Sequence, residues 1–281
     1  MARFFSTATD DRILARQTME AQLRQALGRG EFSLHYQPRL CARTRRMLGA
    51  EALLRWNSPV LGPVSPAEFI PVAEETGWIK PIGLWVLEEA CQQWMQFQSQ
   101  GLFERKQLSV NLSAAQLADP DLVGQLQLIL ERTGLPAHEL ELELTESHLM
   151  DNPNAAQQQV SALKALGVHI AIDDFGTGYS SLAYLKRFEI DILKVDQSFV
   201  RDMLDDSADA AIVHAVIALG HTLGFKVVAE GVENLPTAQT LTALGCDELQ
   251  GYCFSRPLPV PEFLEWLRSH GATPQRRRTR P

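Results

Sequence analysis

Carboxylate side chains stand at the ends of several short apolar runs in this sequence. Residues 171–182 (AIDDFGTGYSSL) place two adjacent aspartates, Asp173 and Asp174, after such a run and before a glycine-rich turn. Other apolar runs end near the further carboxylates Glu51, Glu143 and Glu230. If the fold gathers these groups, they repel one another and raise each other's pKa unless cations hold them ionised.

A hard divalent cation would balance that charge, which Lys194 and Arg55 alone cannot do. Oxygen ligands from Asp, Glu and Asn, without His or Cys, favour Mg²⁺ or Mn²⁺ over Zn²⁺. Adjacent carboxylates such as Asp173 and Asp174 can bridge and flank two ions roughly 3.5 to 4 Å apart. Such a pair is typical of sites where a metal-activated water attacks a phosphodiester, so the residues predict a metal-dependent site.

Each of these residues also has a purely structural interpretation. Two aspartates before a glycine are common in turns and helix caps. A lone Glu at a strand end is usually solvated, and Lys194 alone would form a rim ion pair of small energy. Residues 139–146 (ELELELTE) would make an amphipathic strand with one wet face. These interpretations weaken only because several strands repeat the same pattern.

Short apolar strands alternate with longer amphipathic helices along the chain. We expect strands at 32–38, 49–56, 107–113, 139–146, 169–176, 192–199, 226–233 and 248–255. Repeated strand–helix units imply a parallel sheet with right-handed crossovers. About eight strands in roughly 250 residues fit an α/β fold of the (β/α)8 barrel type better than an open sheet. No GxGxxG or GxxxxGK[ST] loop follows any of these strands, which removes the usual support for a nucleotide-binding open sheet.

Side chains alternate across a strand, so parity shows which face each residue takes. Glu51 and Arg55 share a face, and Asp196 shares the face of Lys194. Six expected strands carry a polar residue near the carboxyl end of the face away from the helices, at Asn111, Glu143, Asp173, Lys194, Glu230 and Gln250. In a barrel that face is the interior, and its carboxyl rim is where active sites are built.

Bulk properties exclude some classes of protein. A net charge of −8 over 281 residues argues against a dedicated binder of nucleic acid or of membrane surfaces, since both are held mainly by Lys and Arg. Four cysteines without a CxxC pair indicate reduced thiols and favour a cytoplasmic location. The seven histidines show no metal-ligand spacing, and no stretch approaches 18 consecutive apolar residues.

The chain is expected to hold one large domain with a short extension at each end. Residues 1–22 form a lead-in helix or connector, because residues 11–30 show helical spacing and end in Gly-Arg-Gly. Residues 23–270 form the barrel. Residues 271–281 are expected to be a basic disordered tail.

With these residues assembled, the chain resembles the EAL family of cyclic di-GMP phosphodiesterases from about residue 23 to about residue 267. Eight motifs occur in the family's order and at comparable spacing, and together they are highly specific. They are YQP (36–38), EALLRW (51–56), NLS (111–113), ELTE (143–146), DDFGTGYSSL (173–182), KVDQSF (194–199), AEGVE (229–233) and QGYCFSRPLP (250–259).

The resemblance implies a modified TIM (β/α)8 barrel whose first strand runs antiparallel to the others. It implies hydrolysis of cyclic di-GMP to linear 5′-pGpG, dependent on two Mg²⁺ or Mn²⁺ ions and inhibited by Ca²⁺. Domains of this kind often pair, so a homodimer is also expected. The helix before residue 31 resembles the connector that often follows a GGDEF domain, so an upstream GGDEF or sensor domain is expected, although a standalone protein would read the same way.

Carried over by motif, the first metal would be held by Glu51, Asn111, Glu143 and Asp173, and the second by Asp173 with Asp174 and Glu230. Lys194 would orient the attacking water, and Gln250 would assist at that water or its metal shell. Arg55 would grip a substrate phosphate, Gln37 would lie near a guanine, and Asp196 is expected on the substrate side of the site. Glu146 would pin the 173–182 loop, and Glu233 would stand behind or beside the metals.

Two competing functions follow from the same residues. The first is a catalytically silent receptor for cyclic di-GMP, or a module for a partner protein, that keeps the pocket but turns over negligibly. The second is a metal-dependent barrel enzyme for a small metabolite, which rests on fold analogy alone. All site positions match the motifs, which favours the working phosphodiesterase; Val195 stands where Ile is more usual, a neutral change.

Overall fold

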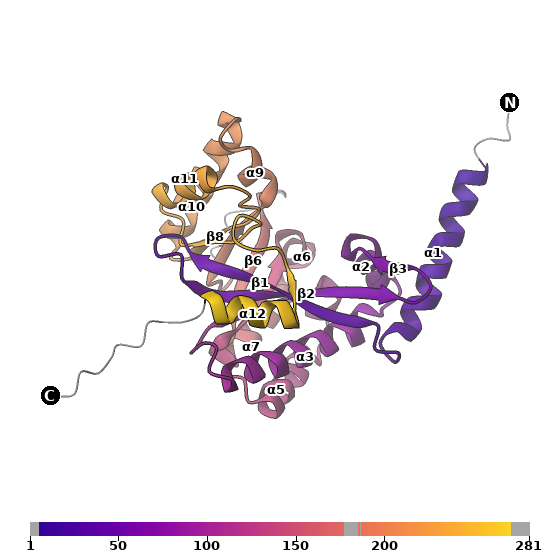
Figure 1. Ribbon diagram of the computed structural model, residues 1–281. Helices are drawn as coiled ribbons and strands as arrows, with labels where there is room; N and C mark the ends of the chain where they lie inside the picture. The colour runs from indigo at the N-terminus through magenta and orange to yellow at the C-terminus, as the bar shows by residue number, and fades with distance from the viewer. Residues whose placement is uncertain (1–5, 177–184, 186, 271–281) are drawn as a thin grey trace.

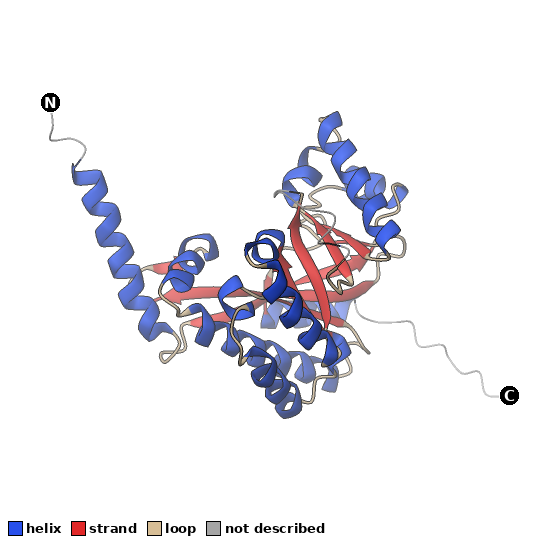
Figure 2. Cartoon of the chain, turned by 180° about the vertical axis from the view of Figure 1, so that it is seen from behind, coloured by secondary structure: helices blue, strands red, loops and turns tan. Residues whose placement is uncertain are grey.

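A computed structural model describes residues 6–176, 185 and 187–270, and it contains a closed barrel of strands wrapped by helices (Figures 1 and 2). The strands are β1 (Phe32–Cys41), β2 (Met47–Ser58), β3 (Gly62–Val64), β4 (Gln107–Asn111), β5 (Leu140–Thr145), β6 (His169–Phe175), β7 (Ile192–Val195), β8 (Lys226–Ala229), β9 (Glu248–Leu249) and β10 (Leu258–Pro259). The tail at 271–281 and most of the 173–182 loop lie outside the described residues.

Eight of these strands form the barrel in the order β1, β2, β4, β5, β6, β7, β8, β9, and β1 then pairs back onto β9. β1 runs antiparallel to both of its barrel neighbours, whereas the other barrel strands pair in parallel. The predicted modified TIM barrel with an antiparallel first strand is therefore confirmed. β3 and β10 are short additions that pair with β2 and β1.

Most of the helices lie around the outside of the barrel (Figure 2). The helices of the described residues are α1 (Ser6–Ala26), α2 (Pro66–Glu75), α3 (Ile79–Ser99), α4 (Ala114–Leu117), α5 (Leu122–Thr133), α6 (Glu146–Asp151), α7 (Pro153–Ala165), α9 (Gln197–Asp202), α10 (Ser207–Leu223), α11 (Leu235–Ala243) and α12 (Val260–His270), with a 3₁₀ turn at Ala137–Glu139. Among the described residues, no helix is both long enough and apolar enough to cross a membrane.

Strand alternation places the core between the sheet and these helices. The outward residues of β5, Leu140, Leu142 and Leu144, are fully buried, as expected for side chains that pack on helices. On the helix side, Gly220 of α10 has no room for a side chain, because a Cβ there would lie 2.5 Å from a methyl carbon of Val227. The glycine therefore lets α10 pack closely on β8.

Three strands end earlier than their sequence predicts. The strands expected at 192–199, 226–233 and 248–255 end at Val195, Ala229 and Leu249. The chain after Val195 turns at once into α9, because the Asp196 side chain accepts a hydrogen bond from the Ser198 N–H and caps that helix. The polar residues that follow these strands therefore lie at the rim rather than within the ladder.

The helix α1 projects away from the barrel, and its last turns pack where β2 extends past the barrel wall (Figure 1). Leu23 and Ala26 are buried there, whereas Leu14 is 63% exposed. The helix runs through the expected boundary at residues 22 and 23 without a break. Its C-terminal end is thus part of the barrel's packing.

Candidate active site

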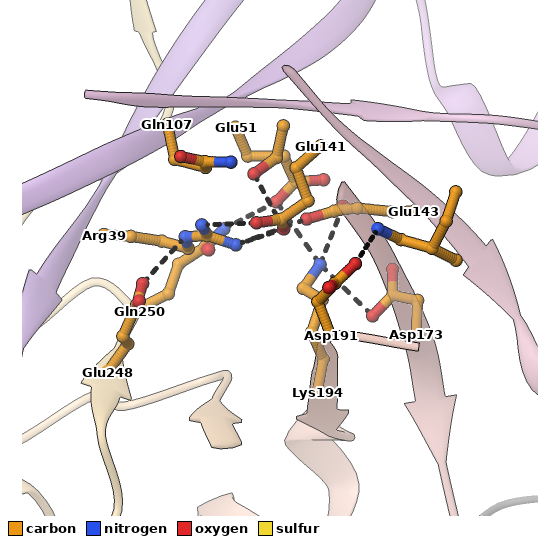
Figure 3. A network of polar contacts seen from close by, with 12 residues as sticks. Arg39, Glu51, Gln107, Glu141, Glu143, Asp173, Asp191, Lys194, Glu248 and Gln250 are labelled. Carbon is orange, nitrogen blue, oxygen red and sulfur yellow. Dashed lines mark hydrogen bonds and ion pairs between the residues drawn. The ribbon is translucent and has the colours of Figure 1, made fainter. Parts of the chain in front are cut away.

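Lys194 lies at the centre of the carboxylates that the sequence analysis selected (Figure 3). Its Nζ atom lies 2.7 Å from Glu230, 2.8 Å from Glu143, 3.2 Å from Asp173 and 3.9 Å from Glu51. The lysine side chain is fully buried. The fold therefore gathers acidic residues from four elements around one ammonium group at the carboxyl rim.

Two amide side chains orient Glu51 from either side. Asn111 Nδ2 donates to Glu51 Oε1 at 2.6 Å, and Gln250 Nε2 donates to Glu51 Oε2 at 2.6 Å. The same Gln250 nitrogen lies 3.1 Å from Gln37 Oε1, and Gln37 donates in turn to the Ser255 carbonyl. This arrangement leaves the amide oxygen of Asn111 available for a cation.

The backbone explains how two adjacent aspartates serve one site. Successive residues of a strand normally point to opposite faces, but the pairing of β6 with β7 shifts register between Ile172 and Phe175. Asp174 within this bulge has a left-handed φ of 54°, an unusual conformation that is often found at functional sites. Asp173, Asp174 and Glu230 each contribute one carboxylate oxygen to a group of three atoms that lie within 4.8 Å of one another.

Burial and mutual repulsion raise the pKa of several of these acids. Burial, and then the charge of Asp173, raise the pKa of Glu230 to about 8. Burial, then Asp173 and a hydrogen bond with Asp196, raise the pKa of Asp174 to about 6. Burial followed by the other carboxylates raises the pKa of Glu143 well above its usual value. Part of the cluster is thus protonated near neutral pH when no added cation balances it.

Glu51 and Lys194 of the cluster stay ionised. Burial opposes the charged form of Glu51, but Lys194 and the amides of Gln250 and Asn111 lower its pKa below the usual value. Burial likewise opposes the ammonium form of Lys194, but the surrounding carboxylates, with Asp173 first, raise its pKa well above 10.5. Lys194 is therefore a permanent positive charge in this site.

The cluster fits a hard divalent cation. Its donors are carboxylate and amide oxygens, which Mg²⁺ and Mn²⁺ prefer. The buried Oε1 atoms of Gln250 and Glu143 have no hydrogen-bond partner among the described residues. The residues Asp173, Asp174 and Glu230 can hold a metal ion.

A pocket of about 320 Å³ lies against the cluster. The pocket is lined by Glu51, Asp173, Glu230 and Gln250 of the site, and also by Arg55 and Gln37. The Arg55 guanidinium donates to the Leu54 carbonyl at 2.8 Å. At the rim, the Arg256 guanidinium stacks 4.3 Å above the ring centre of Tyr252, which also lines the pocket.

The structure places three further predicted residues around this site. Glu146 Oε2 accepts a hydrogen bond from the Gly176 N–H at 3.2 Å, at the start of the 173–182 loop. Asp196 lies beside Asp174 while it caps α9. Glu233 lines the pocket mouth, where its side chain is 48% exposed and pairs with Arg201 at 3.5 Å.

One buried residue escaped the sequence analysis. Arg39 is 1% exposed and fills the barrel interior beneath the cluster, where it pairs with Glu141 and Glu248. The signal was present, since Arg39 has the same strand parity as Gln37.

Comparison with known proteins identifies the family. The family model described as EAL domain matches residues 20–257. The chain belongs to the EAL-domain family. This EAL chain is 46% identical over 261 residues to the bifunctional diguanylate cyclase/cyclic di-GMP phosphodiesterase MucR of Pseudomonas aeruginosa. It is 43% identical over 269 residues to the cyclic di-GMP phosphodiesterase NbdA of the same organism.

These alignments cover most of the EAL chain but a minority of each relative. They span 93% of the chain and 38% of MucR, and 96% of the chain and 34% of NbdA. The solved structure of the PaMucR phosphodiesterase in complex with c-di-GMP matches with a TM-score of 0.84 and 47% identity. That match covers 88% of this chain and 99% of the solved one. The chain is therefore similar to the EAL portion of longer proteins.

Proposed function

We propose that this chain is a phosphodiesterase that hydrolyses one phosphodiester of cyclic di-GMP to linear 5′-pGpG with two Mg²⁺ or Mn²⁺ ions. The observation that carries the proposal is the gathering of Glu51, Glu143, Asp173 and Glu230 around Lys194, next to a pocket that Glu51, Asp173, Glu230 and Arg55 line. The relatives MucR and NbdA are both named as cyclic di-GMP phosphodiesterases, which supports the same substrate here.

The proposed ligand sets follow from the positions of the carboxylates. Glu51, Asn111, Glu143 and Asp173 would hold one ion, and Asp173, Asp174 and Glu230 the other. When bound, the ions would supply a Lewis acid that activates water and balances charge developing on the phosphate. The bulge at Asp174 supports this assignment, because it lets Asp173 and Asp174 both serve the site.

The remaining residues would position the water and the substrate. Lys194 carries a buried positive charge, so it would orient the attacking water and stabilise the anionic phosphorus centre. Gln250 would assist there, because its Oε1 atom has no other partner among the described residues. Arg55 would grip a phosphate of the ligand with its planar guanidinium, a geometry suited to phosphate.

Four residues would act at the edges of the site. Gln37 would contact a guanine, because it lines the pocket and its amide is already oriented by Gln250 and Ser255. Asp196 would face the substrate side beside Asp174. Glu146 would hold the start of the 173–182 loop through Gly176. Glu233 would stand beside the metals only after leaving Arg201.

The test is turnover of cyclic di-GMP by the purified chain with Mg²⁺, Mn²⁺ or Ca²⁺, followed by chromatography of the linear product. We expect product with Mg²⁺ or Mn²⁺, none with Ca²⁺, and none from a Glu51→Ala variant that keeps the wild-type circular dichroism spectrum. Binding of cyclic di-GMP without product in any metal would make the chain a receptor instead. The homodimer, the cytoplasmic location and an upstream GGDEF or sensor domain remain predictions.

A further inference from the structure

A second polar layer lies in the barrel two residues along the strands from the proposed metal site, and Figure 3 shows Arg39, Glu141 and Glu248 of this layer beside Glu143. Its members are Arg39, Ser109, Glu141 and Glu248, and each is at most 4% exposed. We call this group the polar floor. The interior of a TM barrel is ordinarily filled by branched apolar side chains, so a buried charged layer there requires an explanation that the proposed chemistry does not supply.

Arg39 is the centre of the polar floor. Its Nη2 atom donates to Glu141 Oε2 at 2.8 Å, its Nη1 atom also bonds Glu141, and its Nε atom lies 3.2 Å from Glu248 Oε2. Ser109 donates to Glu141 at 3.0 Å. A guanidinium can make this fork, whereas a lysine ammonium cannot reproduce two parallel bonds with a third contact at its side.

The members of the floor sit one step below site residues on the same strands. Glu141 precedes Glu143 by two residues on β5, and Ser109 precedes Asn111 by two on β4. Glu248 precedes Gln250 by two at the end of β9. On the antiparallel strand β1, Arg39 follows Gln37 by two, and the register pairs Gln37 with Glu51 and Arg39 with Gly49. Residues two apart share a strand face about 6 to 7 Å apart.

Arg39 therefore ties together three strands that carry site residues. β1 carries Gln37, β5 carries Glu143, and Gln250 directly follows β9. Arg39 Nη1 also lies 3.8 Å from Glu143 Oε1, which has no hydrogen-bond partner in the described part of the chain, while the other oxygen accepts a hydrogen bond from Lys194. Glu143 is thus held by one cation from below and one from the side.

We propose that Arg39 is a positioning residue that fixes Glu143 and Gln250 through Glu141 and Glu248, and so sets the affinity of the site for divalent metal. This inference rests on the proposed metal-dependent function. Replacing the residues that orient metal ligands commonly weakens metal affinity by about 10- to 100-fold. Arg39→Lys would keep the positive charge but lose the paired hydrogen bonds to Glu141, and it should change metal affinity by a factor in that range.

The test compares Arg39→Lys with a matched control, Lys164→Met. Lys164 of α7 pairs at 2.7 Å with Asp191, which directly precedes β7, so its loss removes a short ion pair that does not line the pocket. Each metal-free protein would be titrated calorimetrically with Mn²⁺ alone, and its Tm would be measured. We expect Arg39→Lys to weaken Mn²⁺ binding at least tenfold, and Lys164→Met to change it less than twofold.

Kinetics separate positioning from general damage. In Arg39→Lys, the Mn²⁺ concentration for half-maximal turnover should rise in parallel with the calorimetric Kd, while kcat at saturating Mn²⁺ recovers to within about tenfold of wild type. If Arg39→Lys does not fold, Glu248→Gln serves instead, because it removes one partner of Arg39 without touching Glu143; it should weaken Mn²⁺ binding several-fold.

The outcomes are distinguishable. Wild-type Mn²⁺ affinity in a folded Arg39→Lys or Glu248→Gln protein with a lowered Tm would overturn the inference and leave the proposed function intact. A wild-type chain that binds Mn²⁺ without turnover, with weakened binding in Arg39→Lys, would overturn the proposed function and support the inference. A wild-type chain that binds no divalent metal would overturn both.

Discussion

The rim cluster, made of Lys194 and the carboxylates around it, and the polar floor are two buried charged layers of one barrel. The two layers offset the desolvation of their charges differently. The floor sets Glu141 and Glu248 against Arg39, and the Arg39 guanidinium, opposing the effect of burial, lowers the pKa of Glu141. The rim sets five carboxylates against Lys194, and the pKa of Glu230 rises to about 8. Arg39 and Lys194 are the two Lys or Arg side chains that are buried among the described residues.

The difference shows which layer requires an external cation. A buried acid is stable when a cation and hydrogen bonds offset its desolvation, as they do for Glu141 through Arg39 and Ser109. The rim has one cation for five acids, so Glu143, Asp174 and Glu230 bind protons more readily than usual. A bound metal ion would displace those protons. Excess negative charge, rather than the mere presence of carboxylates, is therefore the signature of the metal site.

The largest effect is expected at the rim, where Lys194→Met removes its cation. Turnover of cyclic di-GMP should fall about 10³- to 10⁴-fold, because the charge that orients the water and stabilises the phosphorus centre is lost. The measurement is kcat with saturating Mn²⁺ on protein whose circular dichroism matches wild type. Activity within tenfold of wild type would show that Lys194 has no part in the reaction.

A double-mutant cycle tests the coupling between Arg39 and Glu141 in the polar floor. Arg39→Met should lower the free energy of unfolding by about 3 to 5 kcal/mol, because it leaves buried carboxylates unpaired. Adding Glu141→Met should recover a large part of that loss, because the buried charge is removed together with its partner. Denaturant unfolding of the two single variants and the double variant gives the coupling. Additive losses in the double variant would mean that the pair is not coupled.

Proton release distinguishes the layers directly. With a pKa of about 8, Glu230 is mostly protonated at pH 7 in the metal-free protein, and metal binding requires its ionised form. Glu230 should thus contribute about one released proton at pH 7 and progressively less toward pH 9, in addition to any proton released by Glu143, whose pKa is also raised. Calorimetry in buffers of different ionisation enthalpy measures this number. Equal release in Glu230→Gln would contradict the assignment.

The same pKa determines the sign of a stability effect. The folded metal-free protein binds the Glu230 proton more tightly than the unfolded chain, whose Glu has the ordinary pKa of 4.5. Its stability should therefore fall as pH rises from about 4.5 toward 8 and be restored by Mn²⁺. Thermal unfolding across this range, with and without Mn²⁺, checks the direction.

A smaller effect is expected outside both layers, at Asp191. Burial opposes its charge, but hydrogen bonds from His169, Lys164 and the Ile170 N–H lower its pKa from 3.8 to about 2. Because the folded pKa is the lower one, the stabilisation is complete above about pH 4 and is lost as pH falls toward 2. We expect a loss of about 2 kcal/mol over this window, and Asp191→Asn should flatten the profile. If Asp191→Asn leaves the pH dependence of stability unchanged, Asp191 is not the source of that dependence.

Much of the fold and site could be predicted from local patterns. Alternation within strands placed Asn111, Glu143, Asp173 and Lys194 on the inward face, and the structure brings Glu143 and Asp173 to Lys194. Strand ends were predicted less well, because Asp196 caps a helix where an extended strand was expected. The bulge that turns Asp174 toward Asp173 depends on the pairing of β6 with β7, which no local pattern shows.

The sequence by itself determined the barrel class and the identity of the rim carboxylates, since strand periodicity and motif order are properties of neighbouring residues. Only the tertiary structure decided which charges meet. Arg39 meets Glu141 across 102 residues, and Gln250 meets Glu51 across 199. These contacts depend on how the strands are staggered when the barrel closes, because the stagger sets which inward side chains share a layer. The same stagger puts a layer with one cation for two carboxylates beneath a rim with one cation for five.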